Sequence, residues 1–133
     1  FAVANVTVNG ETRPAIYARS SSRIIWRVRP PRGAWLSVWL ALDPAVWDRG
    51  GDGVLFRIGI SDGRQYDELL SQHVDPHQVP GDRRWIPVTI DLSPYANRDV
   101  DLIFNTDASA PGQKGTPDHD ESIWGAPAIR LGR

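Results

Sequence analysis

The chain has 133 residues, of which 41% are hydrophobic and 23% are charged, a balance typical of one globular domain rather than of a disordered segment. Its formal net charge of −1 lacks the basic excess of a nucleic-acid binder. Cysteine is absent, which excludes disulfides, thiol catalysis and cysteine-ligated zinc, and no apolar run approaches the roughly 18 residues of a membrane span. Methionine is absent as well, even at position 1. We therefore expect residues 1–133 to form a single module that was processed, or excised from a longer protein.

Short apolar runs separated by turn residues predict an all-β chain. Twelve glycines and 11 prolines punctuate the sequence, and no long capped helix is evident. Period-two alternation of apolar and polar residues locates the strands. In chain order they cover residues 2–8, 14–18, 23–29, 35–42, 54–60, 66–74, 85–92, 100–105 and a last strand region at 122–129 that continues through 128–131. Residues 66–70 could alternatively form a helical turn.

The same alternation predicts which side chains face the core. In residues 35–42 the leucines and Val38 share one face, and the tryptophans share the other. We interpret Trp85 and Trp124 as core residues, and Gly125 as a point where the backbone approaches another group closely. Tyr95 is expected to bury its ring and to bond nearby backbone through its hydroxyl.

Charge is unevenly distributed along the chain. Residues 1–33 contain six arginines and one glutamate, whereas the remaining residues carry a net negative charge. The favoured interpretation is that early strands lie beside late ones, so that arginine pairs with aspartate across the sheet. The alternative is a face that binds anions.

Five segments together resemble a known family. They are Arg-Gly-Ala-Trp-Leu at 32–36, Ala-Leu-Asp-Pro at 41–44, Gly-Val-Leu-Phe-Arg-Ile at 53–58, the run 85–96 and Trp-Gly-Ala-Pro at 124–127. The chain resembles galactose-binding-like β-sandwich modules, the jelly-roll architecture of many carbohydrate-binding modules. It is similar in particular to accessory domains of bacterial cell-surface and glycan-handling proteins. The resemblance implies two antiparallel sheets and a non-catalytic role in glycan binding, protein docking or scaffolding.

Trp35 and Trp39 are the main candidate ligand-binding residues. Four residues along a strand span about 13 Å, so both indoles would rise from one sheet face as a platform for sugar rings. Arg27, Arg57 or Asp101 would supply hydrogen bonds to the sugar. The alternatives are that this face is covered by a loop, docks a neighbouring domain or mediates self-association.

Two loops add further candidates. Trp47 lies in a loop at the rim, where it either grips a ligand or plugs the open end of the core. Residues 107–121 form a long acidic stretch, in which Asp107, Asp118, Asp120 and Glu121 offer the oxygen ligands that calcium prefers. A structural calcium ion is therefore one hypothesis for this stretch, and a solvated acidic loop is the other.

Catalysis has little support. His73 and His77 lack a third metal ligand, and His119 has no nucleophile placed with it. The sequence therefore predicts an exported, extracellular or cell-surface module that binds glycan without catalysis. The alternative is a structural or assembly domain of a larger surface protein or filament, in which the tryptophan face is a protein contact. A hydrolase ranks third.

Overall fold

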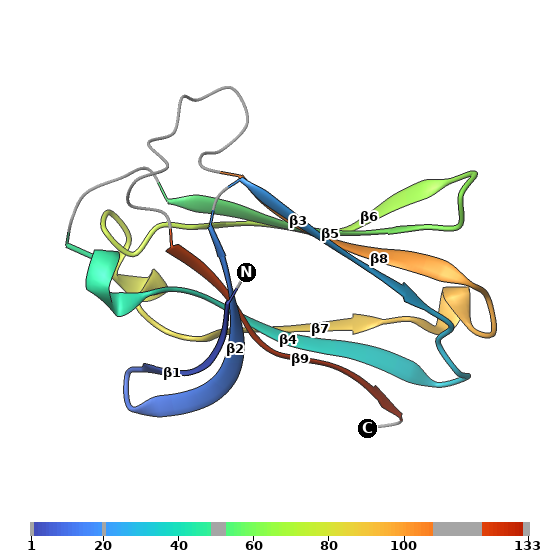
Figure 1. Cartoon of the computed structure of the whole chain (residues 1–133), viewed down its shortest axis with the longest axis horizontal. Helices are drawn as coiled ribbons and strands as arrows, with labels where there is room; N and C mark the ends of the chain where they lie inside the picture. Colours follow the sequence, from blue (N-terminus) through green and yellow to red (C-terminus); the bar gives the residue numbers. More distant parts are fainter. Residues whose placement is uncertain (1, 20, 49–52, 108–120, 132–133) are drawn as a thin grey trace.

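The computed structural model describes residues 2–19, 21–48, 53–107 and 121–131, and these form nine strands in two antiparallel sheets (Figure 1). The strands are β1 (Ala2–Val8), β2 (Glu11–Arg19), β3 (Ser22–Val28), β4 (Ala34–Leu42), β5 (Val54–Ser61), β6 (Tyr66–Val74), β7 (Ile86–Asp91), β8 (Val100–Asp107) and β9 (Glu121–Leu131). In the described connections lie three single-turn 3-10 helices: η1 (Pro44–Val46), η2 (Pro80–Asp82) and η3 (Ser93–Tyr95). None of the helices in the described part of the chain is long and apolar enough to cross a membrane.

The two sheets stack as a sandwich, which confirms the predicted fold class. The five-stranded sheet has the order β1-β2-β9-β4-β7, and the four-stranded sheet has the order β3-β8-β5-β6. Residues 66–74 form a strand along their whole length and not a helical turn. The predicted last strand region forms one continuous strand, β9, which begins at Glu121 and whose first residues pair with both β2 and β4.

The main core fills the space between the sheets. It contains the inward-facing residues of β4, β5 and β8, as the alternation predicts, and Trp124 at its centre is fully buried. The Trp124 ring centroid lies 5.0 Å from that of Phe56 and 4.5 Å from that of Phe104. The prediction that Trp124 is a core residue is therefore confirmed.

A second, smaller apolar cluster lies on the outer face of the five-stranded sheet. Figure 1 shows why: the β1–β2 hairpin curls below β4 and β9, on the side away from the four-stranded sheet. Trp85 is buried in this cluster with residues of the hairpin, and its Nε1 donates a hydrogen bond to the Glu11 carbonyl oxygen (2.9 Å). Trp85 is thus a core residue as predicted, but it belongs to the cluster under the hairpin and not to the main core.

Gly125 makes room for this arrangement. A Cβ atom there would lie 2.5 Å from Trp85 Cζ3, closer than two unbonded carbons can pack. The predicted close approach at Gly125 is confirmed, and the indole of Trp85 is what approaches it.

Candidate functional site

Trp35 and Trp39 lie on the outer face of β4, as the alternation predicts. Both side chains are half-buried, with Ser37 between them on the same face. Their surroundings differ, because the hairpin covers one end of this sheet face and not the other.

Trp39 is covered by an arginine. The guanidinium carbon of Arg13 lies 3.7 Å from the Trp39 ring centroid, a stacked cation–π contact. Arg13 also forms an ion pair with Glu11 (2.7 Å), and Trp39 packs against the cluster that contains Trp85. One face of the Trp39 indole is therefore already occupied by the protein itself.

Trp35 has polar neighbours on both adjacent strands. Its cross-strand partners are Asp91 on β7 and Arg130 on β9, and the next outward position pairs Ser37 with Thr89. We call these five residues the Trp35 strip. It combines a half-buried indole with a carboxylate, a guanidinium group and two hydroxyls, the groups that bind the apolar and the hydroxyl faces of a sugar.

The Asp91 carboxylate is held in its ionised form. Its Oδ1 accepts hydrogen bonds from the Ser93 hydroxyl (2.6 Å) and the Ser93 backbone N–H (2.9 Å). These two bonds hold the pKa of Asp91 below its usual value, and the bond from the Ser93 hydroxyl has the larger effect. Asp91 therefore serves the Trp35 strip as a hydrogen-bond acceptor at neutral pH.

Arg27 and Arg57 do not join this strip. They project from β3 and β5 on the outer face of the four-stranded sheet, on the opposite side of the sandwich. Arg27 pairs with Asp101 (2.6 Å) and Arg57 with Asp107 (2.8 Å). The expectation that Arg27, Arg57 or Asp101 supplies hydrogen bonds beside Trp35 and Trp39 is therefore wrong, whereas the predicted pairing of early arginines with late aspartates is confirmed.

Trp47 follows η1 and packs against the edges of both apolar clusters. Its Nε1 donates a hydrogen bond to the Leu42 carbonyl oxygen (3.0 Å). These contacts agree with its predicted role as a plug, and a part in ligand binding stays a prediction.

The acidic stretch is described only at its two ends. Asp107 ends β8 in its ion pair with Arg57, and the backbone of Glu121 begins β9. Asp118, Asp120 and the side chain of Glu121 lie outside the described residues. Within the described ranges, no group of three acidic or histidine side chains is placed to hold a metal ion. The calcium hypothesis therefore stays a prediction.

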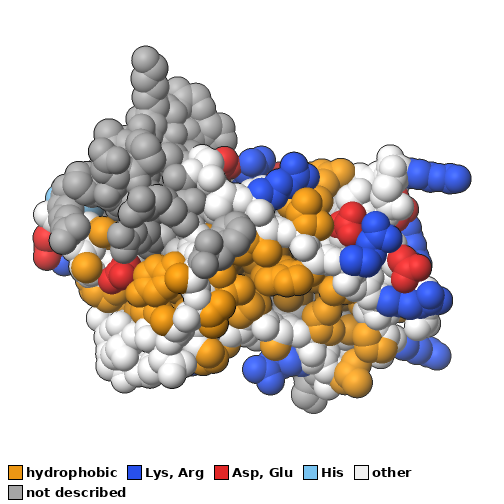
Figure 2. Space-filling view, in the orientation of Figure 1, with side chains coloured by type: hydrophobic (Ala, Val, Ile, Leu, Met, Phe, Trp, Pro, Cys, Tyr) orange, Lys and Arg blue, Asp and Glu red, His pale blue; other side chains and the backbone are white. Residues whose placement is uncertain are grey.

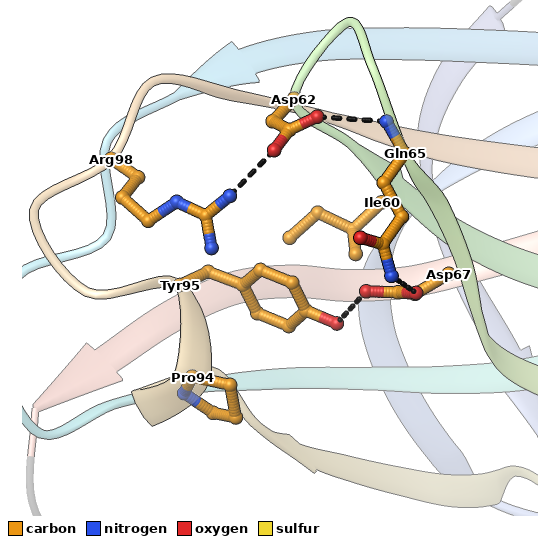
Figure 3. Close-up of a pocket in the computed structure, with 7 residues that line it drawn as sticks. All are labelled: Ile60, Asp62, Gln65, Asp67, Pro94, Tyr95 and Arg98. Carbon is orange, nitrogen blue, oxygen red and sulfur yellow. Dashed lines mark hydrogen bonds and ion pairs between the residues drawn. The ribbon is translucent and has the colours of Figure 1, made fainter.

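The structure also contains a pocket that the sequence did not indicate (Figure 3). It lies between the β5–β6 turn and the segment that joins β7 to β8, and its volume is about 170 Å³. We call it the end pocket. Its lining residues are Ile60, Asp62, Gln65, Asp67, Pro94, Tyr95 and Arg98.

The Tyr95 hydroxyl corrects one expectation. It donates its hydrogen bond to Asp67 Oδ2 (2.6 Å) and not to nearby backbone. Burial, together with this bond to a carboxylate, raises the pKa of Tyr95 to about 12. The hydroxyl thus stays protonated at neutral pH, with its hydrogen committed to Asp67.

Comparison with known proteins places this fold in a class. No protein-family model matches the chain. The chain resembles a solved structure from Clostridium perfringens ZmpB that contains the M60 catalytic domain with the CBM51-1 and CBM51-2 domains. The TM-score is 0.64 and the sequence identity is 14%, and the match covers 98% of this chain and 12% of the ZmpB chain. It also resembles a ZmpB structure of CBM51-2 in complex with GlcNAc and INT domains, with a TM-score of 0.63 and 18% identity over 96% and 25% of the two chains.

These domains are carbohydrate-binding modules. The chain has their β-sandwich fold, which confirms the predicted resemblance to galactose-binding-like modules. One relative in sequence, an uncharacterized protein of Archaeoglobus fulgidus, is 39% identical over 100 residues. This match covers 74% of the present chain and 24% of the archaeal protein.

Proposed function

We propose that this chain is a non-catalytic module of an exported protein that binds glycan at the Trp35 strip. The observation that carries the proposal is the half-buried Trp35 indole between Asp91 and Arg130, with Ser37 and Thr89 beside it. Sugar C–H groups pack on an aromatic plane while charged and hydroxyl groups bind the sugar hydroxyls. The likeness to CBM51 domains, one of them in complex with GlcNAc, supports the proposal.

Trp39 and Arg13 have a supporting role in this proposal. The stacked pair would form a wall at one end of the Trp35 strip. This wall is held in place because the hairpin that carries Arg13 accepts a hydrogen bond from Trp85 at the Glu11 carbonyl oxygen. The ligand would then contact Trp35 by its ring face and the wall by its edge.

The non-catalytic part of the proposal rests on the carboxylates. Glycoside hydrolysis ordinarily uses two carboxyl groups that flank the scissile bond. The Trp35 strip contains one, Asp91, and its oxygen is already bonded twice by Ser93. This arrangement suits an acceptor in binding better than a general acid.

A glycan-array screen of the purified chain, followed by calorimetry with the best ligand, tests the proposal. Trp35→Ala should weaken binding at least about tenfold, equivalent to about 1.4 kcal/mol, because an aromatic ring at the centre of a site carries a large share of its affinity. The matched control is Tyr66→Ala. It removes an aromatic ring that is 48% exposed and lies on the opposite sheet, where Tyr66 of β6 pairs with Ser61 of β5. Binding of no glycan would contradict the proposal, and so would equal losses in the two variants. Repeating the screen without calcium tests the acidic stretch.

An assembly role is the second candidate, and one surface favours it. An apolar groove of about 230 Å³ lies at the seam between the sheets, next to the edge strand β3. Hydrophobic side chains gather along the middle of the face shown in Figure 2, between the two sheets. The groove is lined by Trp26, Val28, Leu36, Leu102, Phe104, Pro127, Ala128 and Ile129. A sedimentation coefficient that rises with protein concentration would support assembly through this groove, provided that Ile129→Lys abolishes the concentration dependence.

A further inference from the structure

We infer that the end pocket is a second binding site, which takes one neutral sugar unit through its hydroxyl groups. The inference rests on the proposed function, since it names the class of ligand and adds a site on the same module. It is carried by the geometry of Asp62, Asp67, Gln65, Tyr95 and Arg98 in Figure 3.

The walls of the end pocket are fixed before any ligand arrives. Arg98 on one segment forms an ion pair with Asp62 on the other (2.6 Å), and Tyr95 and Asp67 join the same two segments. The Asp62 carboxylate also accepts hydrogen bonds from the backbone N–H groups of Arg64 and Gln65, each 2.9 Å long. A preformed site loses little conformational entropy when a ligand binds.

The segment that carries Arg98 is anchored from behind as well. Asn97 adopts a left-handed backbone conformation, with φ of 60°, and its N–H donates to the Pro30 carbonyl oxygen (2.7 Å). This bond turns the chain so that Arg98 faces Asp62 across the opening, as Figure 3 shows. The backbone of Arg98 is thus positioned by this bond, and the ion pair with Asp62 positions its guanidinium group.

The polar groups retain capacity for a ligand. A guanidinium group has five N–H donors, and Arg98 uses one of them on Asp62. Gln65 donates from its Nε2 to Asp67 (3.1 Å), which leaves its amide oxygen as an acceptor. The Tyr95 oxygen has given its hydrogen to Asp67 and can only accept. Hydroxyl groups suit such a set because each one both donates and accepts.

An apolar floor completes the fit to a sugar. Ile60 is almost fully buried beneath the opening, and Pro94 and the Tyr95 ring stand beside it. Carbon atoms of a sugar ring can pack there while its hydroxyls reach the polar rim. This combination of a small apolar surface and convergent polar groups is typical of a small-molecule site.

Charge and size define the ligand class. Asp62 and Asp67 each carry a negative charge and Arg98 a positive one, so the lining has a net charge of −1, which disfavours acidic sugars. The volume of about 170 Å³ is small for a ligand pocket, which favours a single sugar ring over a chain of sugars. A neutral monosaccharide or the terminal unit of a neutral glycan meets both limits.

Titration of the isotopically labelled chain with neutral methyl hexosides, followed by amide chemical shifts, tests this inference. Residues 61–67 and 93–98 should shift together, and glucuronate should bind at least about tenfold more weakly because of the like charge. Arg98→Gln and Gln65→Met should each weaken neutral-sugar binding. The matched control for Arg98 is Arg64→Gln, an arginine of the same turn that does not line the end pocket and should leave binding unchanged.

The outcomes separate this inference from the proposed function. If a glycan binds at the Trp35 strip but no neutral hexoside shifts residues 61–67, the end pocket is not a sugar site and the proposed function stands. Glucuronate binding equal to that of the hexosides would overturn the assigned ligand class. If the array finds no glycan at the Trp35 strip but the end pocket still binds hexosides, the proposed site is wrong and this inference survives. Gln65→Met guards against loss of folding in Arg98→Gln, because Gln65 is exposed and joins no second segment.

Discussion

Two glycines on the outer faces of the sheets provide a sharp test of how the hairpin is clamped. A Cβ atom at Gly125 would lie 2.5 Å from Trp85 Cζ3, and a Cβ atom at Gly59 would collide with the hydroxyl end of Tyr66. The obstructing side chains differ in freedom: Trp85 is 5% exposed and bonded to Glu11, whereas Tyr66 is 48% exposed. The same substitution should therefore have different costs at the two positions.

The size of each effect follows from what can move. Overpacking a locked aromatic costs about 1–3 kcal/mol, and replacing glycine by alanine returns about 0.4–1 kcal/mol through the unfolded chain. Gly125→Ala should thus lower the free energy of unfolding by about 1–2 kcal/mol. Gly59→Ala should change the free energy of unfolding by less than about 0.5 kcal/mol, because the Tyr66 ring can rotate into solvent. The packing that Tyr66 then loses offsets the stabilisation that alanine gives by restricting the unfolded chain.

Urea unfolding followed by tryptophan fluorescence measures both values. A double-mutant cycle with Trp85→Phe isolates the contact, since phenylalanine lacks the ring atoms nearest Gly125. In the Trp85→Phe background, Gly125→Ala should cost less than it does in the parent chain. Equal costs at Gly59 and Gly125, or additivity of Trp85→Phe with Gly125→Ala, would refute the clamp.

Three further predictions concern charged and polar contacts. The pKa of Tyr95 is about 12 in the folded chain, against 10.0 for the ordinary side chain. The protonated hydroxyl therefore stabilises the fold fully below pH 10, and this stabilisation is lost as the pH rises toward 12. Tyr95→Phe should accordingly flatten the pH dependence of the free energy of unfolding between pH 10 and 12. Arg27 and Asp101 have side chains that are 71% and 31% exposed, so a double-mutant cycle should give only a small coupling between them, and this coupling should shrink in high salt. Arg13→Ala should expose Trp39 and increase acrylamide quenching, with a stability loss of about 1–2 kcal/mol, since the Arg13 side chain is only 21% exposed where it stacks on the half-buried Trp39.

The fold was predictable because its signals are local. Alternation along residues 35–42 predicts the two faces of β4, and the turn dipeptide Asn9-Gly10 predicts the β1–β2 hairpin, whose residues Asn9 and Gly10 both have positive φ angles. The pairing partners of β9 were not predictable in this way. Its residues Ser122 to Gly125 pair with β2 on one side and with β4 on the other, and both partners are distant in the sequence.

The site was only partly predictable, for a related reason. Alternation assigns a side chain to the inner or the outer face of its own strand, but it does not say which sheet contains the strand. Arg27 and Arg57 do point outward, but they lie on the four-stranded sheet, whereas Trp35 lies on the five-stranded sheet. The end pocket had no sequence signal, because it arises where residues 61–67 meet residues 93–98, two turns that the topology alone brings together.

Both proposed sites lie toward one end of the sandwich, and the hairpin accounts for the position of the Trp35 strip. By stacking Arg13 on Trp39, it covers the part of the outer sheet face next to Trp85, whereas Trp35 lies farther along this face, near the start of β4. In Figure 1 β4 begins at the end of the molecule where η3 and the β5–β6 turn lie. The η3 helix directly links the two sites, since Asp91 of the Trp35 strip bonds Ser93, its first residue, and Tyr95, its last, lines the end pocket. A change at Ser93 or Tyr95 is therefore expected to affect both proposed sites through this short segment.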